Sequence, residues 1–118
     1  MNIKWEVEYY MTSTGKAPAK DFIESLPVKL KAKVFRDIDL LEEFGTEIIM
    51  PHSKPLREGV HELRVRLGND RSRILYFFFR NQKIILTNGF IKKTKKVPPA
   101  ELEKALKFKA DHERRFSE

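Results

Sequence analysis

Residues 54–96 read KPLREGVHELRVRLGNDRSRILYFFFRNQKIILTNGFIKKTKK and contain three runs that predict neighbouring strands of one sheet. The run 60–67 alternates apolar and charged side chains, as a strand with one buried face does. The run 73–79 is the densest apolar segment and predicts a central strand that is covered on much of both faces. Short turns with Gly-Asn-Asp and Asn-Gln separate the runs, and Gly89 in the third run, 83–91, allows a bend or a close approach of another segment.

The residues before this stretch predict one more strand and two helices. Residues 3–10 alternate apolar and polar side chains, which favours a strand. Pro18 suits the first turn of a short helix over 19–26, and apolar residues three and four apart predict a longer helix over 28–44 that ends at Gly45. Residues 46–59 hold two prolines and one glycine and are predicted to form a loop.

The residues after this stretch predict one last helix. Pro98 and Pro99 suit its first turn, and residues 111–118, DHERRFSE, are expected to fray. The predicted order is β-α-α-β-β-β-α. We therefore expect an α+β fold with a small, twisted, mostly antiparallel sheet, an N-terminal helical hairpin and a C-terminal helix. A chain of 118 residues fits a single domain, 1–118.

The composition restricts the chemistry that the chain can perform. It contains 41% hydrophobic residues and nine Phe, which is typical of a globular protein, and it has no Cys. Disulfides, zinc–thiolate sites and thiol catalysis are therefore excluded. Neither a signal-peptide-like run nor an apolar segment of membrane-spanning length occurs, so we expect a soluble cytoplasmic protein that does not enter a membrane.

The net charge of +7 is concentrated in the second half of the chain. Residues 1–56 hold 8 Lys/Arg against 9 Asp/Glu, a net of −1, whereas residues 57–118 hold 16 against 8, a net of +8. Such a field attracts phosphate polymers and makes their binding depend on salt. The alternative is a surface charge that only keeps the protein in solution.

Three motifs in the chain resemble a known group of proteins. They are L-R-E-G with E-L-R at residues 56–64, R-I-L-Y at 73–76, and G-F-x-K-K-T-x-K at 89–96, which is followed by prolines and a Glu-Leu helix. Over about residues 3–110 the chain resembles the phage-derived branch of the RelE/ParE toxin superfamily. This branch comprises the HigB-like host-inhibition toxins of type II toxin–antitoxin pairs.

The resemblance implies a RelE-like fold and an mRNA endonuclease, or mRNA interferase, that acts on translating ribosomes without metal or cofactor. It also implies a helix-turn-helix antitoxin as partner, which blocks the toxin and forms a repressor complex with it. The chain would then meet DNA only through the antitoxin. Two alternatives stay open. One is a toxin that poisons gyrase, as the ParE group does, and the other is an RNA-binding or interaction module without catalysis.

Four residues are candidates for catalysis. Arg73 is the first choice, because it matches the arginine of the R-x-L/I-Y motif and its planar fork can grip a phosphate. Arg64 in E-L-R is expected to flank the same phosphate. Lys93, from the basic pair after Gly-Phe, could act as acid or base if cationic neighbours lower its pKa. Tyr76 is a candidate for proton transfer. We expect Arg73→Ala to abolish growth arrest and to spare the fold.

A second set is expected to hold the RNA, and no residue is expected to bind a metal. The RNA-binding candidates are Arg66, Lys92, Lys95, Lys96, Phe90 and Lys54. Phe90 could stack on a base, with core packing as the alternative. Glu62, His61 and His52 are further candidates for proton transfer, although alternation places His61 on the apolar side of its strand. The central expectation is that the guanidinium of Arg73 and the lysines after Phe90 converge on one phosphate-sized pocket.

Overall fold

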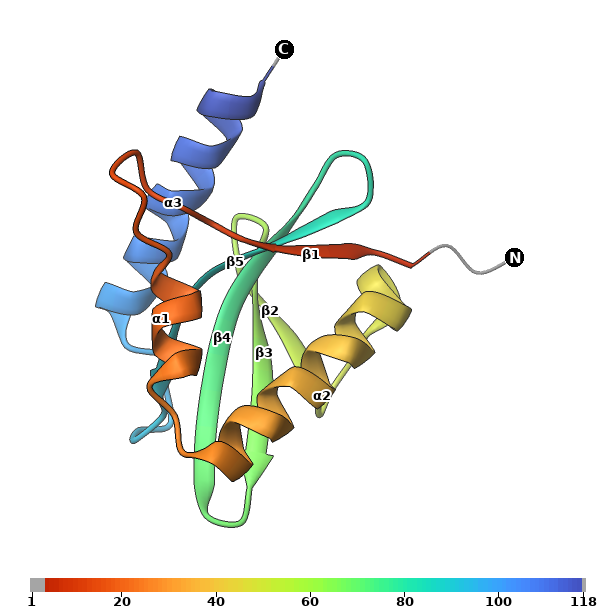
Figure 1. Ribbon diagram of the computed structural model, residues 1–118, viewed down its shortest axis with the longest axis vertical. Helices are drawn as coiled ribbons and strands as arrows, with labels where there is room; N and C mark the ends of the chain where they lie inside the picture. Colours follow the sequence, from red (N-terminus) through yellow and green to blue (C-terminus); the bar gives the residue numbers. More distant parts are fainter. Residues whose placement is uncertain (1–3, 118) are drawn as a thin grey trace.

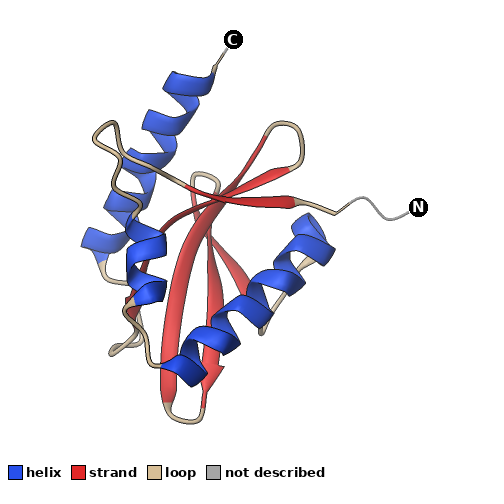
Figure 2. Cartoon of the chain, viewed as in Figure 1, coloured by secondary structure: helices blue, strands red, loops and turns tan. Residues whose placement is uncertain are grey.

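A five-stranded sheet in the order β1-β5-β4-β3-β2 forms the centre of the fold (Figures 1 and 2). The computed structural model describes residues 4–117. Its strands are β1 (Glu6–Tyr9), β2 (Ser53–Arg57), β3 (Val60–Leu67), β4 (Asp70–Phe79) and β5 (Lys83–Ile91). Strands β2 to β5 pair antiparallel, whereas β1 lies parallel to β5 at the edge. The predicted α+β class with a mostly antiparallel sheet is confirmed.

The two faces of the sheet are covered by different helices. Helices α1 (Pro18–Glu24) and α2 (Val28–Phe44), orange to gold in Figure 1, pack on one face, where the apolar stripe of α2 meets the core-facing side chains of β3, β4 and β5. Helix α3 (Pro99–Phe116), blue in Figure 1, packs on the other face against smaller clusters around Leu75 and Phe77. No helix within residues 4–117 has the length and apolar character to cross a bilayer.

The two edge strands, β1 and β2, differ from the prediction. Residues 46–59 were expected to be a loop, but they contain β2 after a short 3-10 turn at Gly45–Glu47. Pro55 is tolerated in β2 because this strand lies at the edge of the sheet, where one row of backbone groups needs no ladder partner. Strand β1 begins at Glu6, and the predicted strand position Ile3 lies outside the described residues.

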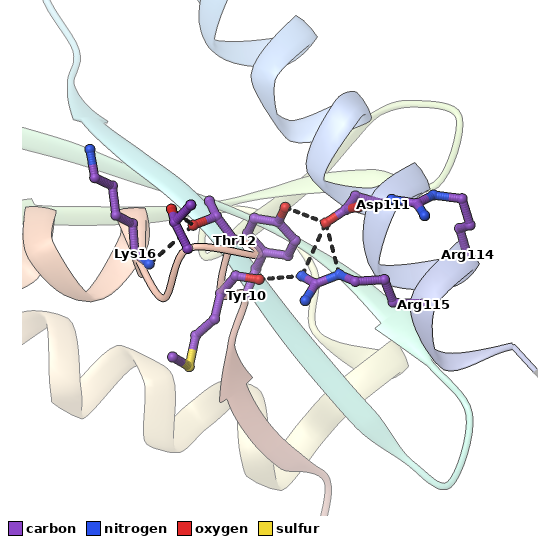
Figure 3. A network of polar contacts seen from close by, with 8 residues as sticks. Tyr10, Thr12, Lys16, Asp111, Arg114 and Arg115 are labelled. Carbon is purple, nitrogen blue, oxygen red and sulfur yellow. Dashed lines mark hydrogen bonds and ion pairs between the residues drawn. The ribbon is translucent and has the colours of Figure 1, made fainter.

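The expectation that residues 111–118 fray is wrong as far as the structure describes them. Helix α3 continues to Phe116, and His112 is buried beside the rings of Phe77 and Phe79. Figure 3 shows the polar contacts that hold this last part of the helix: the hydroxyl of Tyr10 donates a hydrogen bond to Asp111 Oδ2 at 2.6 Å, and Arg115 Nε donates to the same oxygen at 3.0 Å. These contacts tie the end of α3 to the segment that follows β1.

A β-bulge in β5 decides which side chains reach each face of the sheet. Leu75 of β4 pairs with Asn88, whereas its neighbour Tyr76 pairs with Leu86, so Thr87 is an extra residue in β5. Leu86, before the bulge, packs on the α1/α2 face. Phe90, four residues later, packs on the α3 face, although strict alternation would place both on the same face. The bulge thus turns the end of β5 toward the face that carries Arg73.

A candidate phosphate-binding cavity

Basic side chains from β3, β4 and the segment after β5 converge at one end of the sheet, near the turn between β3 and β4. Arg64 and Arg73 are direct cross-strand partners, and Phe90 of β5 lies opposite Arg73 on the other side. The chain then continues along β4, where the backbone N–H of Lys92 donates to the carbonyl of Arg71 at 2.8 Å. The result is a cavity of about 420 Å³, here called the basic cavity. It is lined by Arg64, Arg71, Arg73, Lys92, Lys93, Thr94 and Lys95.

Glu62 holds Arg73 in place beneath this cavity. Arg73 is 2% exposed, and its Nε lies 3.7 Å from Oε2 of Glu62, which is itself 2% exposed. Arg64 Nε lies 3.8 Å from the other carboxylate oxygen of Glu62. Within residues 4–117, neither Arg73 Nε nor Glu62 Oε2 makes a hydrogen bond. Arg73 is therefore a fixed cation at the floor of the cavity and not a strand-end arginine that only contacts solvent.

The basic cavity changes the proton affinity of one of its lysines. Burial lowers the pKa of Lys92 from its ordinary value, and the guanidinium of Arg73 lowers it further, while Glu62 acts in the opposite direction. Burial also lowers the pKa of Arg73, but an arginine keeps its charge at physiological pH. A lysine with a lowered pKa beside a permanent cation is a typical arrangement for proton transfer.

Three aromatic candidates lie away from the basic cavity. Tyr76 is fully buried on the α1/α2 face, where its hydroxyl is hydrogen-bonded to Ser53, so it does not reach a phosphate bound beside Arg73. Burial raises the pKa of Tyr76. Phe90 is a core residue against Leu75 and is 8% exposed, which leaves no face for a base. The ring of His61 stacks on the ring of Tyr76, with their centroids 5.3 Å apart, and burial lowers the pKa of His61. This agrees with the prediction that His61 lies on the apolar side of its strand.

The remaining candidates are spread over the surface around the cavity. Lys93 and Lys95 line the basic cavity and are exposed. Lys54 pairs with Glu62 across β2 and β3, and its charge contributes to the lowered pKa of Lys92. Lys96 is exposed in the same segment as Lys95 but does not line the cavity. Arg66 lines a different cavity, described next.

A second cavity lies on the α2 side of β3 and shares two arginines with the first. Strand β2 pairs with β3 only as far as Leu63, and beyond this point the N–H of Arg64 donates to the carbonyl of His52 at 2.8 Å. This α2-side cavity has a volume of about 230 Å³. It is lined by Lys33, Asp37, Pro51, His52, Arg64, Arg66 and Arg73. Because Arg64 and Arg73 line both cavities, the two spaces meet at these guanidinium groups.

Comparison with known proteins supports the resemblance at the level of the family. The model of the family described as "Phage derived protein Gp49-like (DUF891)" matches residues 21–110, which include every residue of both cavities. The chain belongs to this family. Gp49-like proteins are phage-derived and of toxin-like type. A search of curated proteins returns no match to the chain.

Three charged residues that line the two cavities were absent from the candidates predicted from the sequence. Arg71 was assigned to the turn before β4, although it lies two positions before Arg73 and therefore shares its face. Lys33 and Asp37 were overlooked because α2 was considered only as a core element. The sequence spacing could have identified Asp37. It lies three residues after Val34 and four before Leu41, which places its carboxylate on the buried stripe of the helix.

Proposed function

We propose that this chain is the toxin of a type II toxin–antitoxin pair, a HigB-like mRNA endonuclease that acts on translating ribosomes in the cytoplasm. The observation that carries the proposal is the basic cavity, in which the buried Arg73 lies beside Lys92, a lysine with a lowered pKa. Membership of a phage-derived, toxin-like family supports the biological role. The cavity supports RNA as the substrate, because its six cationic side chains are matched by no acidic one in its lining.

The proposed reaction is attack of a ribose 2′-oxygen on the adjacent phosphorus. The 2′-O–P bond forms and the P–O5′ bond breaks, which leaves a 2′,3′-cyclic phosphate on one fragment and a 5′-hydroxyl on the other. A base takes the proton from the 2′-hydroxyl, and an acid supplies a proton to the leaving 5′-oxygen. The negative charge that grows on the phosphoryl oxygens must be stabilised at the same time.

The residues of the basic cavity divide these tasks. Arg73, held by Glu62, and its cross-strand partner Arg64 bind the phosphoryl oxygens with donors that need no rearrangement during the reaction. Lys92 is the base, because its lowered pKa increases the neutral fraction that can accept a proton. Lys93 lines the same cavity and, as an exposed ammonium group, is the candidate acid. In this assignment the two lysines take the place of Tyr76 as the groups that transfer protons, because Tyr76 lies on the α1/α2 face of the sheet.

The proposed dependence on the ribosome follows from the composition of the cavity. Neither His52 nor His61 lines the basic cavity, so the pairing of a His with a carboxylate that serves many free ribonucleases is absent from its lining. An enzyme of this kind gains much from a substrate whose 2′-hydroxyl, phosphorus and leaving oxygen are already aligned. We expect it to be slow on free RNA and fast on mRNA held in a ribosome.

Induction of the protein in bacteria tests the proposed function. We expect growth arrest with new mRNA 5′-ends inside translated regions and with unchanged DNA supercoiling. A Lys92→Arg variant keeps the charge but not the titrating amine, and it should be produced at the same level with few such ends. Loss of supercoiling with intact mRNA would instead identify a gyrase poison. Growth without arrest at high expression of the native chain would leave only a binding module.

We propose that the partner is a helix-turn-helix antitoxin that places acidic side chains over the basic cavity. The charge of +8 on residues 57–118 supports this surface over the helical hairpin, because carboxylates there compete directly with phosphate. If the neighbouring reading frame encodes a small helix-turn-helix protein, its co-expression should restore growth. If the complex still bound RNA oligonucleotides as strongly as the free chain does, the partner would have to lie elsewhere.

A further inference from the structure

We propose that the α2-side cavity is a nucleobase subsite that accepts guanine, with the attached phosphate in the basic cavity. This inference rests on the proposed action on RNA and adds a base preference to it. The two cavities differ in a way that matters for recognition. The lining of the basic cavity contains no carboxylate, whereas Asp37 contributes one to the lining of the α2-side cavity. The α2-side cavity thus offers a hydrogen-bond acceptor as well as cationic donors, so it suits a ligand that both accepts and donates hydrogen bonds.

Asp37 carries an acceptor that the described part of the chain leaves unused. The residue is 1% exposed on the buried stripe of α2. Its Oδ1 accepts a hydrogen bond from Lys33 Nζ at 2.6 Å, and its Oδ2 has no hydrogen-bond partner within residues 4–117. A buried carboxylate oxygen without a donor is unfavourable, because its hydrogen bonds to water are lost and no hydrogen bond within the protein replaces them. A ligand N–H in the cavity satisfies this atom.

The other side chains of the cavity are donors. Lys33, Arg64, Arg66 and Arg73 line it. The cavity therefore offers several cationic donors and one anionic acceptor. Guanine matches this set best among the four bases, because O6 and N7 accept from arginine or lysine while its amino group donates to a carboxylate. Uracil lacks an amino group, adenine lacks the O6 acceptor, and cytosine, whose amino group also donates to carboxylates, lacks the O6 and N7 pair that arginine binds in bidentate fashion.

The size and position of the cavity fit one base of a bound strand. Its volume of about 230 Å³ lies below the ~300–1,000 Å³ that is usual for pockets of drug-sized ligands, so it suits a single ring system. Arg64 and Arg73 line both cavities. A nucleotide can thus place its phosphate on one side of these two guanidinium groups and its base on the other.

The test measures binding of nucleoside 3′-monophosphates by NMR titration of the whole chain, with inorganic phosphate as reference. We expect guanosine 3′-monophosphate to bind at least about tenfold more tightly than uridine 3′-monophosphate, since one hydrogen bond to a charged group changes affinity by roughly that factor. Asp37→Asn should reduce this ratio to about twofold or less and should leave phosphate affinity within about twofold. Asp39→Asn, the same change at an exposed position of α2, is the matched control and should preserve the ratio.

A second variant and a separate assay keep the outcomes distinct. Asp37→Leu removes the acceptor completely and places an apolar side chain on the buried stripe, so it should fold and show the same loss of preference. Affinity for any of the other three nucleoside 3′-monophosphates that equals or exceeds the affinity for guanosine 3′-monophosphate, or a preference that survives both Asp37 variants, would overturn the guanine subsite. Failure of the proposed function would be seen separately, as intact ribosome-bound mRNA in a cleavage assay, whatever the base preference.

Discussion

Arg73 stabilises the fold and is proposed to bind phosphate, and both roles depend on its ion pair with Glu62. The two side chains are each 2% exposed and face each other across β3 and β4, with Arg64 on the other carboxylate oxygen. A cation fixed in this way can bind a phosphate without losing rotamer freedom at each turnover. The same arrangement couples activity to stability. The expectation that Arg73→Ala spares the fold is therefore not supported by the structure.

Removal of Arg73 alone should destabilise the protein. We expect Arg73→Ala to lower the free energy of unfolding by about 3 kcal/mol, because Glu62 then stays buried without its closest cation. The double variant Glu62→Gln/Arg73→Ala should recover most of this loss and still fail to cleave RNA. Urea denaturation provides the free energies. Equal stability of Arg73→Ala and the native chain would show that the ion pair has no structural role.

Lys92 should determine how cleavage depends on pH. Burial and Arg73 lower its pKa, and a base acts only when it is neutral, so the rate should rise with pH until it passes this lowered pKa and then level off. Lys92→Arg should abolish this rise and reduce the rate by about 10²–10⁴-fold. Lys95→Arg, in the same cavity lining, is the control and should keep the native profile. A native pH profile in Lys92→Arg would assign the proton transfer to another group.

At the scale of elements, the hydrogen bond from Tyr10 to Asp111 holds the end of α3 against the segment that follows β1 (Figure 3). Tyr10→Phe should lower the free energy of unfolding by about 1 kcal/mol, since the hydrogen bond that the hydroxyl donates to the Asp111 carboxylate is lost. Tyr9→Phe is the matched control, because the Tyr9 hydroxyl makes no hydrogen bond within residues 4–117. Chemical denaturation of the two variants side by side measures the difference.

The contribution of this contact should also depend on pH in a defined direction. The hydrogen bond from Tyr10 lowers the pKa of Asp111, so the stabilisation is present above the usual carboxyl range and is lost as the pH falls through the lowered pKa. The difference between Tyr10→Phe and the native chain should therefore shrink in acid. A difference that stayed constant down to low pH would mean that the hydroxyl acts through packing alone.

The sequence predicted the regular elements well where a period was long and uninterrupted. The apolar stripe of α2 and the alternation of β3 gave the observed bounds, because burial on one face imposes that period. Strand β2 was missed because an edge strand with a proline carries no such period. The bulge at Thr87 was also missed, since it depends on pairing with β4 and leaves no mark in β5 itself. Without knowledge of the bulge, the face of the sheet on which Phe90 and the following lysines lie cannot be derived.

The sequence predicted that cationic side chains would gather at the candidate site, but it did not predict the burial of Arg73 or the α2-side cavity. Arg64 and Arg73 do meet Lys92, Lys93 and Lys95 in one cavity, because neighbouring antiparallel strands bring their ends together, whereas Lys96 does not line it. The burial of Arg73 depends on Glu62 in another strand. The α2-side cavity requires a helix to lie beside β3. Both are tertiary features that a linear pattern does not contain.

At the scale of the whole molecule, the charge is distributed so that binding of RNA should depend strongly on salt. If single-stranded RNA contacts about three phosphates in and around the basic cavity, the logarithm of the affinity should fall with the logarithm of salt concentration with a slope of about −2. Lys93→Gln and Lys95→Gln should each reduce the slope by about 0.7. Lys20→Gln on α1, which does not line the cavity, should leave the slope unchanged. A slope near zero would show that the basic cavity does not bind RNA phosphates.

The chemistry of the cleaved ends tests the central claim most directly. Purified protein is added to ribosomes stalled on a defined mRNA, and the fragments are analysed for their terminal groups. The account predicts a 2′,3′-cyclic phosphate on the upstream fragment and a 5′-hydroxyl on the downstream one, with much slower cleavage by Lys92→Arg. Intact mRNA, or fragments that end in a 3′-hydroxyl and a 5′-phosphate, would contradict cleavage by the side chains of the basic cavity.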